Sequence, residues 1–183
     1  MGRPFRRGLM VVRKLSLAEL GAYRALHRHG LEHDPDAFVE TVAQDEARDD
    51  AEIAAILGRG EAWGVFDGDR LMGKLVIDRL PYAVMSHTRW LHAIYVHPDA
   101  RGTGAGASLM VGAIEDAAAN GARRFLLWVN DRNQTARRFY EKLGFEEIGR
   151  IDQGIAAGAH YVDDVLMQLK TDPLALAGSR PSP

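Results

Sequence analysis

The sequence predicts a mixed α+β fold built on one layer of sheet, and three observations support that prediction. A hairpin of two apolar strands lies in the first half of the chain, a strand–helix–strand–helix unit follows it, and further strands end the pattern. Hairpins give antiparallel pairs, whereas a strand–helix–strand unit gives a parallel pair. This order differs from the βαβαβ ladder of a dinucleotide-binding fold. The 183 residues suffice for one domain, predicted over residues 1–170.

The first third of the chain is predicted to form one strand and two helices. The apolar stretch Leu9–Lys14 favours a strand, and Ser16–Glu19 is a capping box in front of a helical stripe of apolar residues. A second helix start at Thr41–Gln44 predicts a helix that continues to about Leu57. The glycines of Gly58–Gly60 end it.

A hairpin follows these helices. Ala62–Phe66 and Leu71–Leu80 are apolar segments joined by the turn sequence Asp67–Arg70, which contains a glycine in a position typical of tight hairpins. Pro81–Ser86 is predicted to be a linker, and Trp90–Val96 is predicted to be the next strand.

Helices and strands alternate in the second half. Gly121 and Gly144 each follow a helical pattern, in the position of a C-terminal cap. The segment after Thr171 is rich in Pro, Ser, Gly and Ala, so residues 171–183 are predicted to be a disordered tail. The predicted helices cover residues 105–120 and 133–143, and the predicted strands cover residues 125–129, 145–151 and 160–169.

Composition excludes several classes of function. The net charge of −2 gives no case for a nucleic-acid partner, and no apolar run reaches the length of a membrane span. The apolar stretch after the first arginines is too short for a signal peptide, so a cytoplasmic location is expected. The absence of cysteine excludes disulfides, thiolate metal sites and a cysteine acyl-enzyme. We expect no metal ion.

A glycine-rich turn between a strand and a helix is the most informative segment. Pro98 ends the strand that contains Ala93–Val96, and Arg101–Gly106 carries three glycines before an apolar helix. Glycines let a ligand approach the backbone, and the amides and dipole of a helix N-terminus attract anions. The sequence therefore predicts a phosphate-bearing cofactor.

The turn also satisfies the dinucleotide pattern G-x-G-x-x-A over Gly102–Ala107. Two facts oppose that alternative. The turn follows several strands instead of opening a βαβ unit, and no acidic residue clearly ends the next strand, where Asn130 and Asp131 are the nearest candidates. A nucleotide-binding oxidoreductase is therefore the alternative enzyme class.

A second motif favours a different cofactor. Arg101-x-x-Gly104-x-Gly106, followed by Asn133-x-x-Ala136, Tyr140 and Gly144-Phe145, resembles the Gcn5-related N-acetyltransferase (GNAT) superfamily over residues 62–169. The resemblance implies about seven mostly antiparallel strands flanked by about four helices. Acetyl-coenzyme A would lie between two parallel central strands that splay apart, here Trp90–Val96 and Phe125–Val129.

The resemblance also implies roles for individual residues. Pantetheine would pair with the backbone of Ile94, Tyr95 and Val96, and Asn133 would hydrogen-bond the pantetheine arm. Tyr140 would lie near the sulfur, and Ala136 belongs to the same motif. The pyrophosphate would lie on the amides of the turn, which are those of Arg101, Gly102, Thr103, Gly104, Ala105 and Gly106.

The chemistry of amide formation is consistent with these residues. The reaction needs a neutral amine, a polarised carbonyl and a proton for the leaving thiolate. A strand N–H can polarise the carbonyl and the Tyr140 hydroxyl can supply the proton. Relatives often carry a glutamate base where Trp90 stands here, so the base is open. His92, two residues on, is the candidate because imidazoles titrate near neutral pH, and a water chain is the alternative.

Charge is distributed unevenly along the chain, which bears on the acceptor. The segment Glu32–Glu52 holds nine acidic residues and one arginine, whereas residues 3–28 are strongly basic. In the family the first two helices wall the acceptor pocket, so an acidic wall would attract a cationic amine. A solvated helix face is the alternative.

We therefore expect an N-acetyltransferase that acts on a small-molecule or peptide amine by direct attack. Because the glutamate base is missing, a non-catalytic acyl-coenzyme A sensor with the same fold is a further alternative. Dimers are common in the family, so a homodimer is also an expectation.

Overall fold

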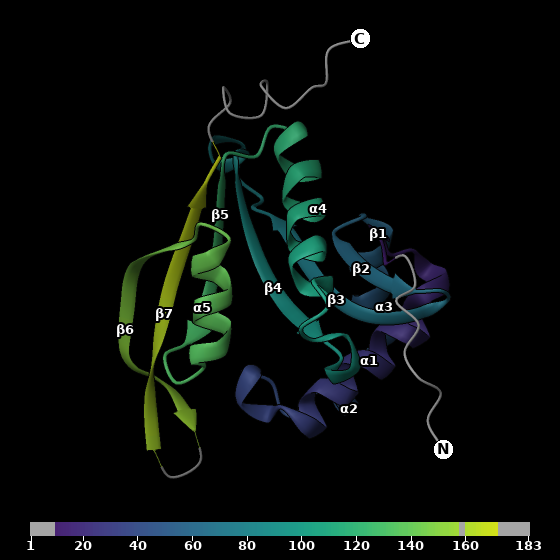
Figure 1. Ribbon diagram of the computed structural model, residues 1–183, viewed down its shortest axis with the longest axis horizontal. Coiled ribbons are helices and arrows are strands. Elements are labelled where there is room, and N and C mark those ends of the chain that lie inside the picture. Colours follow the sequence, from purple (N-terminus) through teal and green to yellow (C-terminus); the bar gives the residue numbers. More distant parts are fainter. Residues whose placement is uncertain (1–9, 158–159, 172–183) are drawn as a thin grey trace.

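A computed structural model describes residues 10–157 and 160–171 of the chain. Its centre is a seven-stranded sheet in the order β1-β2-β3-β4-β5-β7-β6, in which β4 and β5 are parallel and every other neighbouring pair is antiparallel (Figure 1). The predicted fold class is confirmed. The strands are β1 (Val11–Lys14), β2 (Ala62–Asp67), β3 (Arg70–Arg79), β4 (Thr88–Val96), β5 (Arg124–Asn130), β6 (Glu146–Ala157) and β7 (His160–Lys170).

Helices cover both faces of the sheet (Figure 1), and the sheet separates two hydrophobic cores. Alternation along β3 sends Leu75 and Ile77 into a core with α4 and α5, while Val76 enters a second core with α1 and α3. The helices are α1 (Leu20–His33), α2 (Val42–Ala47), α3 (Asp50–Gly58), α4 (Ala105–Ala119) and α5 (Gln134–Lys142).

Local signals in the sequence place most boundaries. The capping box at Ser16–Glu19 forms, although it opens a short 3-10 turn that leads into α1. Gly68 has a φ of 59° in the β2–β3 hairpin, and Gly144 has a φ of 91° after α5. These left-handed conformations explain the glycines at both positions.

One predicted helix is wrong in its extent. The capping box at Thr41–Gln44 forms, but the helix ends at Ala47 instead of Leu57 because Arg48 is extended (φ −74°, ψ 131°). Asp49 then caps a new helix by accepting a hydrogen bond from the Ala51 amide at 2.9 Å. The described chain therefore has five α-helices instead of about four.

Smaller differences lie at the edges of the pattern. The strand predicted to end at Ile151 continues as β6 to Ala157, and the predicted linker holds a 3-10 turn at Ala83–Met85. Leu9 and the tail from residue 172 lie outside the described residues. Among the helices of residues 10–157 and 160–171, none combines the length and apolar character that crossing a bilayer requires.

Gly30 sets how closely α1 approaches its neighbours, and we expect this to be visible in stability. A Cβ at Gly30 would lie 2.6 Å from Phe38 Cζ and 3.1 Å from Tyr95 Cδ2, whereas a Cβ at Gly21 of the same helix meets nothing within 4 Å. Gly30→Ala should lower the free energy of unfolding by about 1–3 kcal/mol through overpacking. Gly21→Ala should raise it by up to about 1 kcal/mol through helix propensity. Equal effects in urea unfolding would contradict this account of Gly30.

Candidate active site

The site begins where two parallel strands stop pairing. Strands β4 and β5 are in register over only three residue pairs, from Thr88↔Arg124 to Trp90↔Leu126. Beyond these pairs the strands separate, as the family resemblance implies. The facing backbone groups of Ile94–Val96 therefore lack a neighbouring strand on that side, and a bound molecule can take its place.

A bulge in β4 lies at the opening. His92 pairs with Val76 and Tyr95 pairs with Lys74, so Ala93 and Ile94 together stand opposite the single residue Leu75. Ala93 has a φ of 51°, which is the left-handed region that non-glycine residues rarely adopt. Such bulges turn a strand and redirect its backbone groups.

A cavity of about 590 Å³ lies in this opening and extends to the glycine turn. Thr103 and Ala105 are the two predicted cofactor-binding residues that do not line it. The Thr103 hydroxyl donates to the Ala100 carbonyl at 2.7 Å and accepts from the Ala105 amide at 3.4 Å, so both residues are used inside the turn. The cofactor role of the others stays a prediction. The predicted residues that line the cavity are Ile94, Tyr95, Val96, Arg101, Gly102, Gly104, Gly106, Asn133, Ala136 and Tyr140.

The glycine turn presents unpaired amides at one end of this cavity. Gly102 and Gly104 have φ of 74° and 93°, and α4 starts after Gly104 without a side-chain cap. Within the described part of the chain, no acceptor takes a hydrogen bond from the amides of Gly102, Gly104, Gly106 or Ala107. Several donors at the positive end of a helix suit a phosphate group.

Arg101 forms a structural contact at the cavity wall. Its guanidinium donates to Asp34 Oδ2 at 2.7 Å and to the Val96 carbonyl at 3.0 Å. Asp34 also accepts from the Tyr95 hydroxyl at 3.0 Å. The hydrogen bond from Arg101 lowers the pKa of Asp34, and burial together with Asp34 raises the pKa of Tyr95 to about 12. The hydrogen bonds among Asp34, Tyr95 and Arg101 connect the end of α1 to the glycine turn.

The oxygen and the nitrogen of the Asn133 side-chain amide have different environments. Its Oδ1 accepts from the Ala136 amide at 3.0 Å and caps α5. Its amide nitrogen donates to no described residue, and the side chain lies on the cavity wall. Capping therefore orients Asn133 without using its donors.

A second cavity of about 730 Å³ joins the first beside the bulge. The two cavities share Ala37, Ile94 and Tyr140. Tyr140 is 7% exposed, burial raises its pKa, and its hydroxyl has no hydrogen-bond partner among the described residues. The phenol is therefore neutral at physiological pH and holds its proton where the cavities meet.

His92 and Trp90 both line the second cavity. His92 Nε2 lies 2.8 Å from Asp78 Oδ2, an arrangement that orients the imidazole, and the His92 side chain is 46% exposed. The Trp90 ring stacks on the Trp128 ring with centroids 6.4 Å apart. Trp90, which stands where relatives often carry a glutamate, thus forms an aromatic wall of the second cavity together with Trp128.

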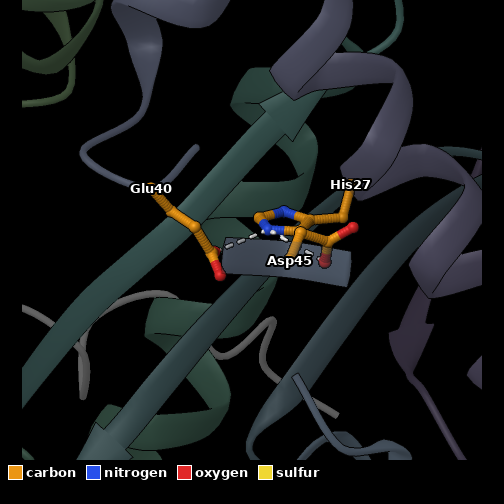
Figure 2. Close-up of side chains that lie close together, drawn as sticks. All are labelled: His27, Glu40 and Asp45. Atoms are coloured by element: carbon orange, nitrogen blue, oxygen red, sulfur yellow. Dashed lines mark hydrogen bonds and ion pairs between the residues drawn. The ribbon is translucent and has the colours of Figure 1, made fainter. Parts of the chain in front are cut away.

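A polar cluster that the sequence did not indicate includes two residues that line the second cavity. Figure 2 shows His27, Glu40 and Asp45, with His27 Nε2 at 3.0 Å from Glu40 Oε2 and 3.9 Å from Asp45 Oδ1. Three such ligand atoms within 4.8 Å of one another could hold a metal ion. Arg48 lies 2.8 Å from Glu40, however, and Arg28 lies 3.7 Å from Asp45. Because cations already balance both carboxylates, the cluster fits a metal ion poorly.

Most acidic residues of the Glu32–Glu52 segment form ion pairs with arginines. Arg24 and Arg28 of α1 pair with acids of the Glu32–Glu52 segment, and Arg48 pairs with two more. Of the nine acids in that segment, Glu40 and Glu52 line the second cavity. The acidic segment is therefore mainly a partner of α1, and only part of it faces the cavity.

Comparisons with known proteins agree with this geometry. The sequence model of the acetyltransferase (GNAT) family matches residues 24–145. An uncharacterized N-acetyltransferase of Mycobacterium tuberculosis is 43% identical over 77 residues, which are 42% of this chain and 48% of that protein. An L-methionine sulfoximine/L-methionine sulfone acetyltransferase of Pseudomonas aeruginosa is 33% identical over 82 residues, 45% of this chain and 48% of that protein. The chain spans about half the length of the curated relatives it matches.

Solved structures extend the similarity to the whole fold. The structure of yncA from Salmonella typhimurium, which holds its cofactor acetyl-CoA, covers 96% of this chain and 98% of its own with a TM-score of 0.77. Its sequence identity is 19%, so this likeness shows the fold alone.

His27 should make the fold sensitive to acid. Burial and the nearby Lys74 lower the pKa of His27 from 6.5 to about 4. Between these values the unfolded chain binds a proton that the folded chain does not, so stability falls as pH falls through this window. Between pH 7 and pH 5 the wild type should lose about 1–2 kcal/mol more than His27→Gln. Urea unfolding at both pH values measures this. An exposed-site control, His33→Gln, should track the wild type, and identical pH dependence in all three would contradict the assignment.

Proposed function

This chain belongs to the acetyltransferase (GNAT) family, and we propose that it transfers the acetyl group of acetyl-coenzyme A to a primary amine of a small molecule. One observation supports this most directly. The buried side chain of Tyr140 lines both cavities, and one of them extends to the unpaired amides of the glycine turn. A cofactor and an acceptor in these cavities would bring their reactive ends together there.

The cofactor would occupy the cavity between β4 and β5. Its pyrophosphate would accept hydrogen bonds from the amides between Gly102 and Ala107, and its pantetheine arm would pair with the open edge of Ile94–Val96. The free amide nitrogen of Asn133 would donate to the same arm.

The reaction would then proceed by direct attack. The acceptor nitrogen forms a bond to the thioester carbon and the carbon–sulfur bond breaks, so the acetyl group moves from sulfur to nitrogen. The amine loses one proton to His92, and the leaving thiolate takes one from Tyr140. Return of a proton from His92 to Tyr140 through solvent restores the enzyme. Asp78 supports this role for His92 by orienting its ring.

The lining of the second cavity favours an acceptor with a second positive charge. Its charged residues include Glu40, Glu52 and Asp164 against Arg48. The faces of Trp90 and Trp128 add surfaces that attract cations. The relative from Pseudomonas aeruginosa is named for an amino-acid-like acceptor, so a small amine is a consistent substrate class.

The two proton-handling side chains should affect turnover more than cofactor binding. Tyr140→Phe should lower kcat on the order of 10²-fold, because the proton is needed only as the thiolate leaves. His92→Gln should lower kcat by about the same factor, because it removes the base but keeps the size of the side chain. Both should leave the KM for acetyl-coenzyme A nearly unchanged. Thiol release at saturating amine measures these values.

Matched variants control for loss of these residue types elsewhere. Tyr161 is exposed on β7, and His87 is exposed in front of β4, both away from the two cavities. Tyr161→Phe and His87→Gln should keep the wild-type kcat. An unchanged kcat in Tyr140→Phe would assign Tyr140 to packing, and an unchanged kcat in His92→Gln would favour a water chain as the base.

Amines of one length but different charge should separate the acceptor classes. We expect kcat/KM to decrease in the order 1,4-diaminobutane, n-butylamine, 4-aminobutyrate. The preference for the diamine should weaken with added salt, since the screening length is about 8 Å at physiological ionic strength. Glu52→Gln should reduce the preference, whereas Glu46→Gln should not, because Glu46 pairs with Arg28 outside the cavity.

The same panel, extended with L-methionine sulfone, tests the proposed function itself. Faster transfer to the sulfone or to 4-aminobutyrate would contradict a cationic acceptor and would indicate an acceptor with a carboxylate, which Arg48 would bind. Binding of acetyl-coenzyme A without thiol release from any amine would refute the transferase and favour an acyl-coenzyme A sensor.

A further inference from the structure

Lys74 is a buried cation that the proposed reaction has not used. It lies on β3, and its side chain is fully buried (0% exposed) on the face covered by α1. Its ammonium group donates to the Ala93 carbonyl at 3.0 Å and lies 4.4 Å from the centre of the Tyr23 ring. Burying a charge is costly unless polar partners compensate, so this position requires an explanation.

No direct ion pair provides that explanation. Within residues 10–157 and 160–171, no carboxylate lies within 4.0 Å of the Lys74 ammonium. The groups that face it are Tyr23 and His27 from α1, Glu40 from the segment before α2, and Asp45 and Arg48 of the following helix and its end. Burial and Arg48 lower the pKa of Lys74 to about 7. The main direct partner of Lys74 is thus a backbone carbonyl.

That carbonyl belongs to the residue with the unusual conformation. Ala93 has a φ of 51° and forms the β4 bulge together with Ile94. The bond between Lys74 and the Ala93 carbonyl fixes one side of the peptide unit that joins Ala93 to Ile94. No cis peptide occurs among the described residues, so in this unit the N–H points away from the C=O. The Ile94 N–H therefore points away from Lys74.

Ile94 is also the strand residue that lines both cavities beside Tyr140. It has no register partner in β3 or in β5. An N–H held at this position can donate to a thioester carbonyl oxygen, on which negative charge develops during attack. The ammonium on the other side of the peptide polarises the same unit, which strengthens its N–H as a donor.

We propose that Lys74 is a positioning residue for acetyl transfer, because it holds the Ala93 carbonyl and thereby aims the Ile94 N–H at the acetyl carbonyl. This inference rests on the proposed function, since it assigns an orientation to the cofactor's thioester. Lys74 touches neither cavity and acts through the peptide of the bulge. The buried amino group of Lys74 is thus retained for orientation instead of stability.

Lys74→Met tests this, because methionine is likewise unbranched and only one atom shorter, and it removes the charge and the hydrogen-bond donor. We expect kcat to fall on the order of 10²-fold, the usual loss for one oxyanion donor, with little change in the KM for acetyl-coenzyme A. Calorimetry supplies a readout without turnover. Wild type should bind acetyl-coenzyme A about tenfold more tightly than coenzyme A, as one hydrogen bond allows, and Lys74→Met should lose most of that difference.

Val76→Ala is the matched control, since Val76 is fully buried on the same face of β3 and its side chain has no group that can donate a hydrogen bond to the Ala93 carbonyl. It should lose stability but keep kcat and the preference for acetyl-coenzyme A. Lys74→Gln keeps a neutral donor on a shorter side chain and should fall between wild type and Lys74→Met, so it carries the test if the methionine variant does not fold.

The outcomes separate the two proposals. Wild-type kcat and wild-type acetyl preference in the folded Lys74 variants would overturn the positioning role. If no amine supports turnover in wild type, the transferase proposal fails, but the affinity difference between acetyl-coenzyme A and coenzyme A still decides the role of Lys74. An equal loss of kcat in Val76→Ala would show a general packing effect and would also overturn it.

Discussion

The early end of pairing between β4 and β5 is the constraint on which the site depends. Backbone groups inside a sheet are normally paired, and two central strands that stop pairing after Trp90 leave such groups open in the middle of the molecule. The bulge at Ala93 adds a second departure from regular pairing at the same place. Under the proposed function a bound cofactor completes the interrupted ladder, and the departure from regular structure creates the surface on which it binds.

Charge organises the other face of the sheet. The arginines of α1 and the acids of the following segment form ion pairs that hold three helices together above β3 and β4. Below this network lies Lys74, whose charge is not balanced by a direct ion pair among the described residues. Exposed ion pairs of this kind contribute little individually to the free energy of unfolding. His27 and Asp45 are buried within the network, so they should favour one particular arrangement of the helices.

Short-range signals predicted much of this arrangement. Caps, turn glycines and apolar periodicity are local, and they located the hairpin, the glycine turn and α5. The helix break at Arg48 was not predicted, although Asp49, which follows it, is a favourable N-cap residue. The contact between Lys74 and Ala93 joins residues on different strands, and it depends on a register that the sequence pattern does not encode.

The segment between α1 and α2 connects the two cavities physically. At its start, Asp34 binds both Arg101 of the glycine turn and the Tyr95 hydroxyl. Near its end, Glu40 binds His27 and Arg48. Ala37, between these anchors, lines both cavities. Because one short segment is fixed beside the first cavity by one carboxylate and beside the second cavity by another, it forms a wall common to both cavities.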